Sequence, residues 1–316
     1  YYLLLAAAVW IYRAGVKKSE NGEIFTWKIR AVYAGMVCFA ILLIGYRPHE
    51  DFRITCLDVG QGDGIFYRFE SGCEIFIDGG STDKKQVGEN IILPFLKYNG
   101  ISHISYWFVS HADNDHISGL TEVLESGYQI EHIVMAETAK KDEATADIIE
   151  KAQTLGVDVI FLSAGDVIEI ASVNNNSQAD NQESIVCLYP GNADFAEDRN
   201  DMCLSFKLTD GDFSGIFAGD IPSQIEQRLV SEYGDGLEAD FYKADHHGSK
   251  YSSSTQWLEA IKPKWTAVSC GEQNRYGHPS DEAVNRIEAV GSRIFYTMES
   301  GQIKYKESAI YENNRQ

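Results

Sequence analysis

Basic side chains are scarce in this sequence of 316 residues. It contains 27 lysines and arginines against 47 aspartates and glutamates, which gives a formal net charge of −20. Residues 1–48 hold six of the basic and two of the acidic side chains, so the remainder carries a net charge near −24. Binding of nucleic acid by general charge attraction depends on lysine and arginine meeting phosphates. The acidic body excludes that mode, and a polyphosphate substrate would need cations or another part of the molecule to hold it.

Cysteines are also few, and they lack the spacing of zinc fingers. Cys38 lies in a hydrophobic stretch, and the other five, an odd number, fall within apolar runs: Cys56, Cys73, Cys187, Cys203 and Cys270. We therefore expect buried core thiols. After residue 50 the sequence shows no internal boundary and no repeat of fixed short period, so one hydrolase-sized domain is expected over residues 49–316.

The hydrophobic stretches are concentrated at the N-terminus. Residues 1–12 (YYLLLAAAVWIY) are apolar and do not begin with methionine, and residues 31–46 carry no charge. Trp27 and Tyr46 can extend the second stretch to both membrane interfaces. A cleaved signal peptide fits less well, because a second hydrophobic stretch precedes it and no small-residue cleavage site follows. Residues 1–48 are thus predicted to be membrane-spanning segments, truncated transmembrane helices that end a longer channel domain.

The loop between these two stretches predicts their orientation. It holds Glu20 and Glu23 against five basic residues, Arg13, Lys17, Lys18, Lys28 and Arg30. By the positive-inside tendency this loop is cytoplasmic. Everything after Tyr46 is then expected on the outer face of the cell membrane.

The remaining sequence alternates short apolar runs with helical patterns. Strands are predicted over residues 52–57, 65–69, 74–77, 104–109, 131–136, 157–162, 184–188, 203–208, 214–218, 239–244 and 265–269. Helices are predicted over residues 87–98, 117–125, 143–155, 222–232, 255–261 and 282–290, with a polar loop at 171–183 and a closing hairpin at 293–306. This order is typical of an α/β protein in which two sheets pack face to face with helices on both outer sides.

One polar segment stands out, residues 110–116 (SHADNDH), directly after the apolar run Ile104–Val109. Each buried polar group costs free energy unless it is paired, so a metal site explains the cluster better than packing does. The alternative is a loop whose aspartates only cap the next helix. His111 and Asp113 leave an extended chain on the same side, and Asp115 and His116 arrive as that helix begins, so the four groups can divide between two cations.

Two other predicted strands end in residues that bind metals. Asp220 follows the strand at 214–218, and the pair His246-His247 follows the strand at 239–244. A carboxylate that bridges two cations is a common way to hold them close, and Asp220 is our candidate bridge. Adjacent residues on an extended chain point opposite ways, so one histidine should bind metal, and we favour His247, with His246 facing substrate. His132 is interpreted as a structural histidine.

Further candidates lie in glycine-rich turns. Asp78 precedes Gly79-Gly80, where its carboxylate could orient a ligand histidine. Asp58 and Asp63 could support the site in the same way, although a glycine turn pinned by aspartates explains them equally well. His278 in a constrained loop could donate a proton, bind a phosphate oxygen or stabilise the turn. The candidate catalytic residues are Asp115, His246 and His278.

With these residues identified, the chain resembles the metallo-β-lactamase superfamily. More narrowly, it resembles the C-terminal hydrolase domain of ComEC-type DNA-uptake channels of naturally competent bacteria. The matching motifs occur in order over about residues 52–306: LDVGQGDG, FIDGG, SHADNDHISG, FAGD, KADHHGS and NRYGHP. Each motif alone is weak, but the ordered set is specific.

The resemblance implies an αββα metallo-β-lactamase-like sandwich with two divalent metal ions. By this resemblance His111, Asp113 and Asp220 would hold one cation. The other would be held by four residues, Asp115, His116, Asp220 and His247. The implied activity is that of a metal-dependent nuclease that degrades the non-imported strand of transforming DNA outside the membrane. The implied partners are DNA, the membrane and other proteins of the competence machinery.

Two departures from the superfamily pattern concern the first cation. Asp113 stands where a histidine is usual, and the histidine usual before the bridging aspartate is missing, with Asn200 or Asp201 the nearest polar candidate. The more oxygen-rich site moves the preference from Zn²⁺ toward Mn²⁺ or Mg²⁺. Two alternative functions remain open. One is a small-molecule phosphodiesterase or other metallo-hydrolase of this fold, and the other is a catalytically inactive structural domain of an uptake channel.

Overall fold

The computed structural model describes residues 32, 34–40, 53–170, 183–306 and 309–312. The chain divides into two units, Tyr1–Glu50 and Asp51–Gln316. In the first unit residues 34–40 are helical. Among the described residues, no helix combines the length and the apolar character needed to cross a membrane. Most of the two predicted membrane segments, and the polar loop predicted at 171–183 up to residue 182, lie outside the described residues.

The second unit contains two mixed β-sheets. The larger sheet has eight strands. In spatial order these are β15 (Ala309–Glu312), β14 (Gln302–Lys306), β1 (Ile54–Leu57), β2 (Gly64–Arg68), β3 (Glu74–Asp78), β4 (His103–Phe108), β5 (Gln129–Ala136) and β6 (Asp158–Leu162). From β3 to β6 neighbouring strands are parallel, and from β15 to β3 they are antiparallel.

The smaller sheet has seven strands. In spatial order these are β13 (Arg293–Tyr296), β12 (Trp265–Val268), β11 (Phe241–Lys243), β10 (Phe213–Phe217), β9 (Ser205–Asp210), β8 (Glu183–Tyr189) and β7 (Val167–Glu169). The strands from β13 to β10 are parallel, and those from β10 to β7 are antiparallel.

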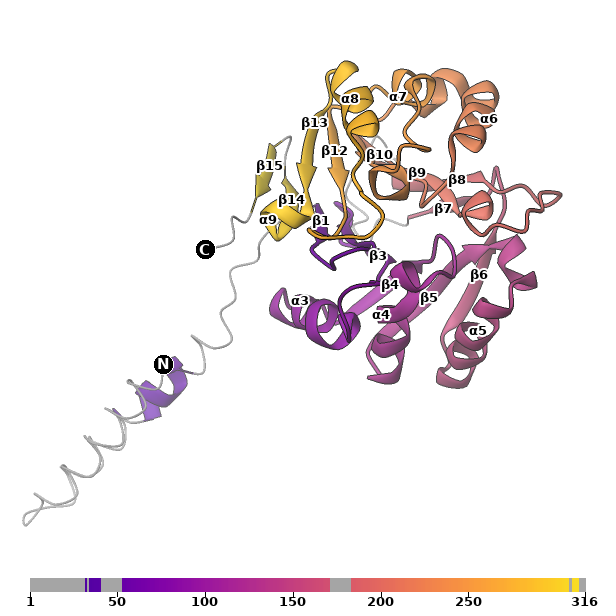
Figure 1. Cartoon of the computed structure of the whole chain (residues 1–316). Coiled ribbons are helices and arrows are strands. Elements are labelled where there is room, and N and C mark those ends of the chain that lie inside the picture. The colour runs from indigo at the N-terminus through magenta and orange to yellow at the C-terminus, as the bar shows by residue number, and fades with distance from the viewer. Residues whose placement is uncertain (1–31, 33, 41–52, 171–182, 307–308, 313–316) are drawn as a thin grey trace, which may run out of the picture. The chain divides into compact units, whose positions relative to one another are not determined.

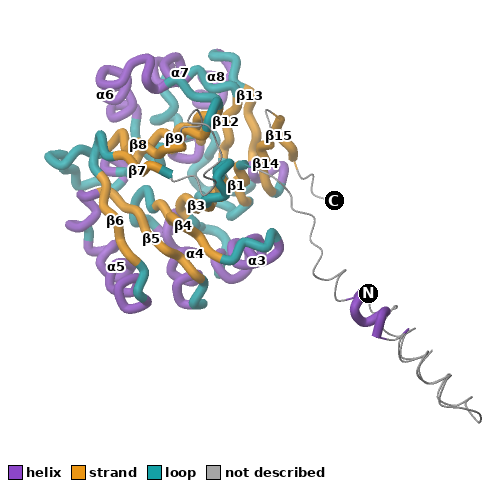
Figure 2. The backbone as a smooth tube through the Cα atoms, turned by 180° about the vertical axis from the view of Figure 1, so that it is seen from behind, coloured by secondary structure: helices purple, strands orange, loops and turns teal. Residues whose placement is uncertain are grey.

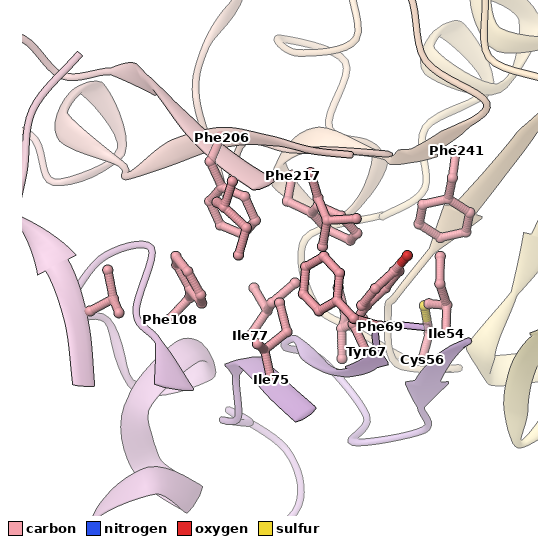
Figure 3. Packing of buried hydrophobic residues seen from close by; sticks show 14 of the residues in the cluster. Ile54, Cys56, Tyr67, Phe69, Ile75, Ile77, Phe108, Phe206, Phe217 and Phe241 are labelled. Carbon is pink, nitrogen blue, oxygen red and sulfur yellow. The ribbon is translucent and has the colours of Figure 1, made fainter. Parts of the chain in front are cut away.

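Apolar side chains fill the space between the two sheets. Figure 3 shows Ile75 and Ile77 of the larger sheet facing Phe206 and Phe217 of the smaller one. The rings of Phe108 and Phe206 lie 4.6 Å apart between centroids. Each such side chain removed from water contributes about 1.5–3 kcal/mol. This layer therefore fixes how the two sheets, and the loops at their edges, face one another.

Helices cover both outer faces. The larger sheet is covered by η1 (Gly88–Ile92), α3 (Leu93–Tyr98), α4 (Asn114–Glu125) and α5 (Glu143–Leu155), and the smaller sheet by α6 (Ser223–Tyr233), α7 (Thr255–Ile261) and α8 (Asp281–Ala289). Figure 1 and the opposite view in Figure 2 show these two helical layers outside the sheets. The αββα sandwich expected from the sequence is therefore confirmed. Four cysteines of this unit are buried free thiols, as expected, and Cys73 is half-buried.

The predicted closing hairpin is wrong. β13 pairs with β12 in the smaller sheet, whereas β14 pairs with β1 in the larger one. The short helix α9 (Thr297–Ser300) and Gly301 connect them. The apolar pattern of the two strands was correct, but each strand finds its partner far away in the sequence, so the chain crosses between sheets where a tight turn was expected.

Candidate metal centre

The candidate site residues follow the ends of several strands of both sheets. Parallel strands deliver the segments after them to one edge of a sheet. His111 and Asp113 follow β4, and Asp115 and His116 occupy the first turn of α4. Asp78 is the last residue of β3, and Asp63 directly precedes β2. The other candidates follow β10, β11 and β12: Asp220, His246, His247 and His278. The packing of the two sheets brings most of these segments together.

Three imidazoles surround the carboxylate of Asp220. Its Oδ2 lies 3.5 Å from Nε2 of His116 and 3.5 Å from Nε2 of His247. Nε2 of His246 is 3.7 Å from the same oxygen. The ring of His111 packs on that of His116, with centroids 4.1 Å apart. Asp220 therefore lies at the centre of the cluster, the place expected of a bridging carboxylate.

The innermost atoms of the cluster fit divalent cations. Nε2 of His111, His116 and His247 and Oδ1 of Asp220 are all buried without a hydrogen-bond partner. Orphaned polar atoms of this kind cost about 1–3 kcal/mol each, so their concentration at one spot needs a compensating ligand. The sets that offer ligand atoms within 4.8 Å of one another include His111, His116 and Asp220, and also Asp115, His116 and His247. Imidazole nitrogen together with carboxylate oxygen suits manganese, iron or zinc.

The outer atoms of two histidines are held by hydrogen bonds. Nδ1 of His116 lies 2.9 Å from Oδ2 of Asp78, and Nδ1 of His247 lies 2.9 Å from the carbonyl oxygen of Ser269. Asp78 also accepts hydrogen bonds from the backbone nitrogen (2.8 Å) and hydroxyl (2.9 Å) of Ser110. A partner on Nδ1 leaves the lone pair of Nε2 directed into the cluster. Asp78 is thus placed to orient His116.

The second glycine after Asp78 allows the backbone of α4 to come close. A Cβ atom at Gly80 would collide with the carbonyl oxygen of Asn114. No side chain fits there, so the FIDGG motif has a steric reason at its last position. The close approach carries Asp115 and His116 into the cluster.

The charges of the cluster stabilise one another. Burial would lower the pKa of His116, but Asp220 and Asp78 raise it well above its ordinary value. Burial likewise opposes the charged form of His247, yet Asp220 and Asp63 raise its pKa to about 9. In return, His247 and His116 hold the pKa of Asp220 well below its usual range despite burial. A cation that binds these histidines must displace protons, so its binding strengthens as pH rises.

The pair His246-His247 differs from the extended geometry that we expected. Both residues lie in the turn η5 (Asp245–Gly248) with positive φ, 51° and 55°. The turn is fixed by hydrogen bonds from His246 N to Gly219 O (3.1 Å) and from Ser249 N to His246 O (2.9 Å). Both imidazoles consequently face Asp220. The prediction that they point opposite ways is wrong, but His247 is the more buried, with 1% of its side chain exposed against 29% for His246.

A buried ion pair beneath the cluster was missed at the sequence level. Nζ of Lys243 lies 2.7 Å from Oδ2 of Asp63, and each side chain is only 2% exposed. Oδ1 of Asp63 is 3.5 Å from Nδ1 of His247. Burial would raise the pKa of Asp63, but Lys243 and His247 hold it below its usual range. The sequence did contain a signal for this ion pair, because a lysine stands in the apolar strand Phe241–Lys243, shortly before His246-His247.

Other candidates lie outside the cluster. Oδ1 of Asp58 accepts hydrogen bonds from Lys84 Nζ (2.7 Å) and Gly60 N (3.2 Å), as in a pinned turn. The ring of His132 stacks on Tyr106, with centroids 5.1 Å apart. Asn200 and Asp201 lie in the short helix η3 (Asn200–Met202), and Asp201 is in none of the groups of potential ligands found among the described residues.

Arg199, adjacent to those two residues, reaches Asp113 instead. Its Nη1 donates to Oδ1 of Asp113 at 2.9 Å, and its Nε donates to Oδ2 of Asp142 at 2.6 Å. Oδ2 of Asp113 lies 3.7 Å from Nε2 of His111, but Asp113 is in none of the groups of potential ligands within the described residues. The permanent positive charge of Arg199 thus holds the carboxylate of Asp113, which the sequence predicted as a metal ligand.

Arg199→Ala is expected to strengthen binding of the cation that Asp113 was predicted to hold. The guanidinium competes with a metal ion for Asp113, and an exposed ion pair is worth at most about 1 kcal/mol, so the expected gain is about fivefold. Calorimetric titration with Mn²⁺ measures it. Arg228→Ala removes a similar pair with Asp194 (2.7 Å) and is the matched control. Weaker binding by Arg199→Ala would instead show that Arg199 orients Asp113 as a ligand.

A row of rings leads from the cluster to the surface. The ring centroid of His278 lies 5.5 Å from that of His246 and 6.3 Å from that of His247. On its other side His278 stacks on Tyr276 at 5.7 Å. Burial and the charges of His247 and His246 lower the pKa of His278 to about 4. His278 is therefore neutral at pH 7, which suits a hydrogen-bond donor to phosphate better than a proton donor.

A groove of about 380 Å³ lies next to the cluster, with His111 in its wall. Its walls combine apolar side chains with the Arg199–Asp142 pair. The apolar part includes Val109, Met135, Ala139, Phe195 and Met202. A volume of this size lies within the range of small-ligand sites, roughly 300–1,000 Å³.

The chain has homologues among competence proteins. It is 27% identical over 291 residues to ComE operon protein 3 of Bacillus subtilis (strain 168), which covers 87% of this chain and 36% of that protein. It is 26% identical over 281 residues to competence protein ComA of Neisseria gonorrhoeae, covering 86% and 36%. The chain thus spans about a third of the length of these curated relatives. The expected relationship to ComEC-type proteins is confirmed.

Family models and solved structures add no assignment to a family. No family model matches the chain. The solved structure of the metallo-β-lactamase fold protein YhfI from Bacillus subtilis is similar, with a TM-score of 0.48 and 11% identity, over 82% of this chain and 99% of that one.

Proposed function

We propose that this chain is a metal-dependent hydrolase that cleaves phosphodiester bonds of single-stranded DNA. The observation that supports it is the convergence of three free imidazole nitrogens and the Asp220 carboxylate on one buried spot. Catalysis at such a spot needs cations, because the rest of the chain is acidic and repels the phosphate backbone.

The donor set assigns a role to each side chain. His111, His116, Asp115, Asp220 and His247 would hold two divalent cations. When bound, such cations lower the pKa of water, polarise the P–O bond and stabilise the leaving oxygen. His246, the more exposed histidine of its pair, faces the side from which substrate enters, and its imidazole can contact a phosphate oxygen. His278 would donate a hydrogen bond to another phosphate oxygen.

The cellular setting is part of the same proposal. The basic residues in the sequence at 13–30 support a hydrolase unit that acts outside the cytoplasm as part of a membrane channel protein. There it would degrade the DNA strand that is not imported during transformation. DNA, the membrane and other competence proteins would be its partners.

A second candidate is a phosphodiesterase that acts on a small molecule. The groove beside His111 favours it, because a volume of about 380 Å³ can enclose a small ester. Both functions would use the same cations, so only the substrate distinguishes them.

A metal-screened cleavage assay on the whole chain tests the proposal. Single-stranded DNA, duplex DNA and bis(p-nitrophenyl) phosphate are offered with Mn²⁺, Zn²⁺ and Mg²⁺ or with EDTA. We expect cleavage of the single strand that depends on the cation. His247→Gln should slow it by at least about 100-fold, the loss that can follow even from removing a residue that only orients a ligand.

His132→Gln is the matched control, because His132 lies outside the cluster, and it should cleave like the wild type. Preference for the small diester would favour the second candidate. An absence of cleavage with every cation, with an unchanged melting temperature in their presence, would identify an inactive structural domain.

A further inference from the structure

Two tyrosines near the candidate site are exposed. Tyr251 is 67% exposed and Tyr276 is 46% exposed. Tyr276 belongs to the row of rings that passes through His278 to His247, and Tyr251 follows the turn η5, which holds His246 and His247. Single exposed aromatic side chains need no explanation, but two in the segments that adjoin the candidate site do.

A basic side chain lies close to each ring, and both rings remain exposed. Nζ of Lys250 lies 5.0 Å from the ring centroid of Tyr251, and the guanidinium carbon of Arg275 lies 4.9 Å from that of Tyr276. Arg275 also donates a hydrogen bond to the hydroxyl of Tyr276 at 2.7 Å. In the part of the chain that the structure describes, neither basic residue forms a salt bridge with a carboxylate. The charged groups of Lys250 and Arg275 therefore remain available to anionic ligands, in a chain whose net charge is −20.

The loops that carry the tyrosines are held in place by hydrogen bonds. The side chain of Asn274 accepts from the backbone nitrogens of Tyr276 (3.1 Å) and His278 (3.0 Å) and donates to two carbonyl oxygens of its own loop. The guanidinium of Arg286 donates to the carbonyl oxygens of Lys250, Ser252 and Ser253. The two loops are joined by a hydrogen bond from Ser280 N to Gly248 O (2.9 Å). Exposed rings on fixed backbones lose little conformational entropy when a ligand stacks on them.

We propose that Lys250, Tyr251, Arg275 and Tyr276 form a stacking surface that holds unpaired bases of single-stranded nucleic acid beside the candidate metal site. The proposal deepens the proposed function and rests on it for the substrate class. Aromatic faces that alternate with cations are the usual means by which proteins bind single strands without sequence preference. Duplex DNA fits less well, because its bases already stack on one another.

The surface also resolves a difficulty raised by the composition. The net negative charge of the chain does not attract DNA. Two basic side chains and two aromatic rings next to the cluster can still hold one strand there. The attraction is then confined to nucleotides close to the phosphate that would be cleaved.

Binding without cleavage tests this surface. The probe is a fluorescein-labelled oligodeoxythymidine, titrated with the whole chain in EDTA and followed by fluorescence anisotropy. Tyr276→Ala and Tyr251→Ala should each raise Kd by about tenfold, while Tyr276→Phe, which keeps the ring, should bind like the wild type. Arg275→Ala should reduce the slope of log K against log salt by about 0.7.

Tyr98→Ala is the matched control. Tyr98 is 68% exposed but ends α3, before the start of β4, whereas the site follows the other end of β4. It should leave Kd unchanged, and equal melting temperatures would show that all variants fold. Wild-type affinity in both tyrosine-to-alanine variants, or wild-type protein that binds duplex as tightly as single strand, would overturn the proposal.

The two proposals fail in different ways. If the wild type cleaves DNA with a cation but the two tyrosine-to-alanine variants bind with wild-type Kd, the stacking surface is rejected and the hydrolase is kept. Tyrosine-dependent binding without cleavage in any cation would reject the hydrolase and keep the surface.

Discussion

Asp220→Ala is expected to abolish cation uptake and hydrolysis together. Its Oδ2 lies within 3.7 Å of three imidazoles, so its loss removes a ligand and also the negative charge that draws cations between the histidines. Cations of this kind supply several kcal/mol of transition-state stabilisation, so the rate should fall by about 1,000-fold or more. Cation content by mass spectrometry and cleavage of single-stranded DNA measure the two effects.

The control for this substitution is Asp158→Ala. Asp158 begins β6, its side chain is 82% exposed, and it lies 3.9 Å from His132, the histidine outside the cluster. It should retain the cation content and rate of the wild type. Wild-type cation content in the Asp220→Ala protein would show that the metal does not depend on Asp220. An absence of cation from both proteins would show that the cluster is a charge network without metal.

Lys243→Met is expected to destabilise the fold by about 3–5 kcal/mol, because it leaves the charge of Asp63 buried without its main partner. Both side chains are 2% exposed, so water cannot replace the lost ion pair. Guanidinium chloride unfolding in EDTA measures the change. Adding Asp63→Asn should recover part of the loss, since the uncompensated charge is then absent.

An exposed ion pair is the comparison for this experiment. Lys262 and Glu238 lie 3.1 Å apart with more than half of each side chain exposed. Lys262→Met should therefore change stability by less than about 1 kcal/mol. Equal effects of the two lysine substitutions would contradict the role of Lys243 as the partner that stabilises the buried charge of Asp63.

The sequence predicted what depends on local pattern. The candidate metal-binding residues lie at strand ends. The alternation of apolar and turn residues identified those strands, so the sequence alone was enough to locate the strand ends that carry Asp220 and His247. The two-sheet sandwich with helices on both sides followed from the order of elements. The motif Asp78-Gly79-Gly80 was assigned correctly as a place of close backbone approach.

What could not be predicted depends on contacts between distant segments. Arg199 reaches Asp113 across 86 residues, and Lys243 reaches Asp63 across 180, with no local signal that pairs them. The directions of His246 and His247 depend on two positive φ angles that their residue types do not favour. The false hairpin at 293–306 arose for the same reason, because strand pairing over long distances is not encoded in a short window.

The pairing of β1 with β14 gives the unit an order of assembly. Ile54 lies opposite Tyr305 in the register, so β1 pairs on one side with a strand that is synthesised much later. On a ribosome the chain emerges from its N-terminus, and β1 must wait with one edge unpaired until residues 302–306 appear. An early stop before β14 would leave that edge open to pair with another chain. The larger sheet therefore gains the pairing of β1 with β14 only after residues 302–306 have been synthesised.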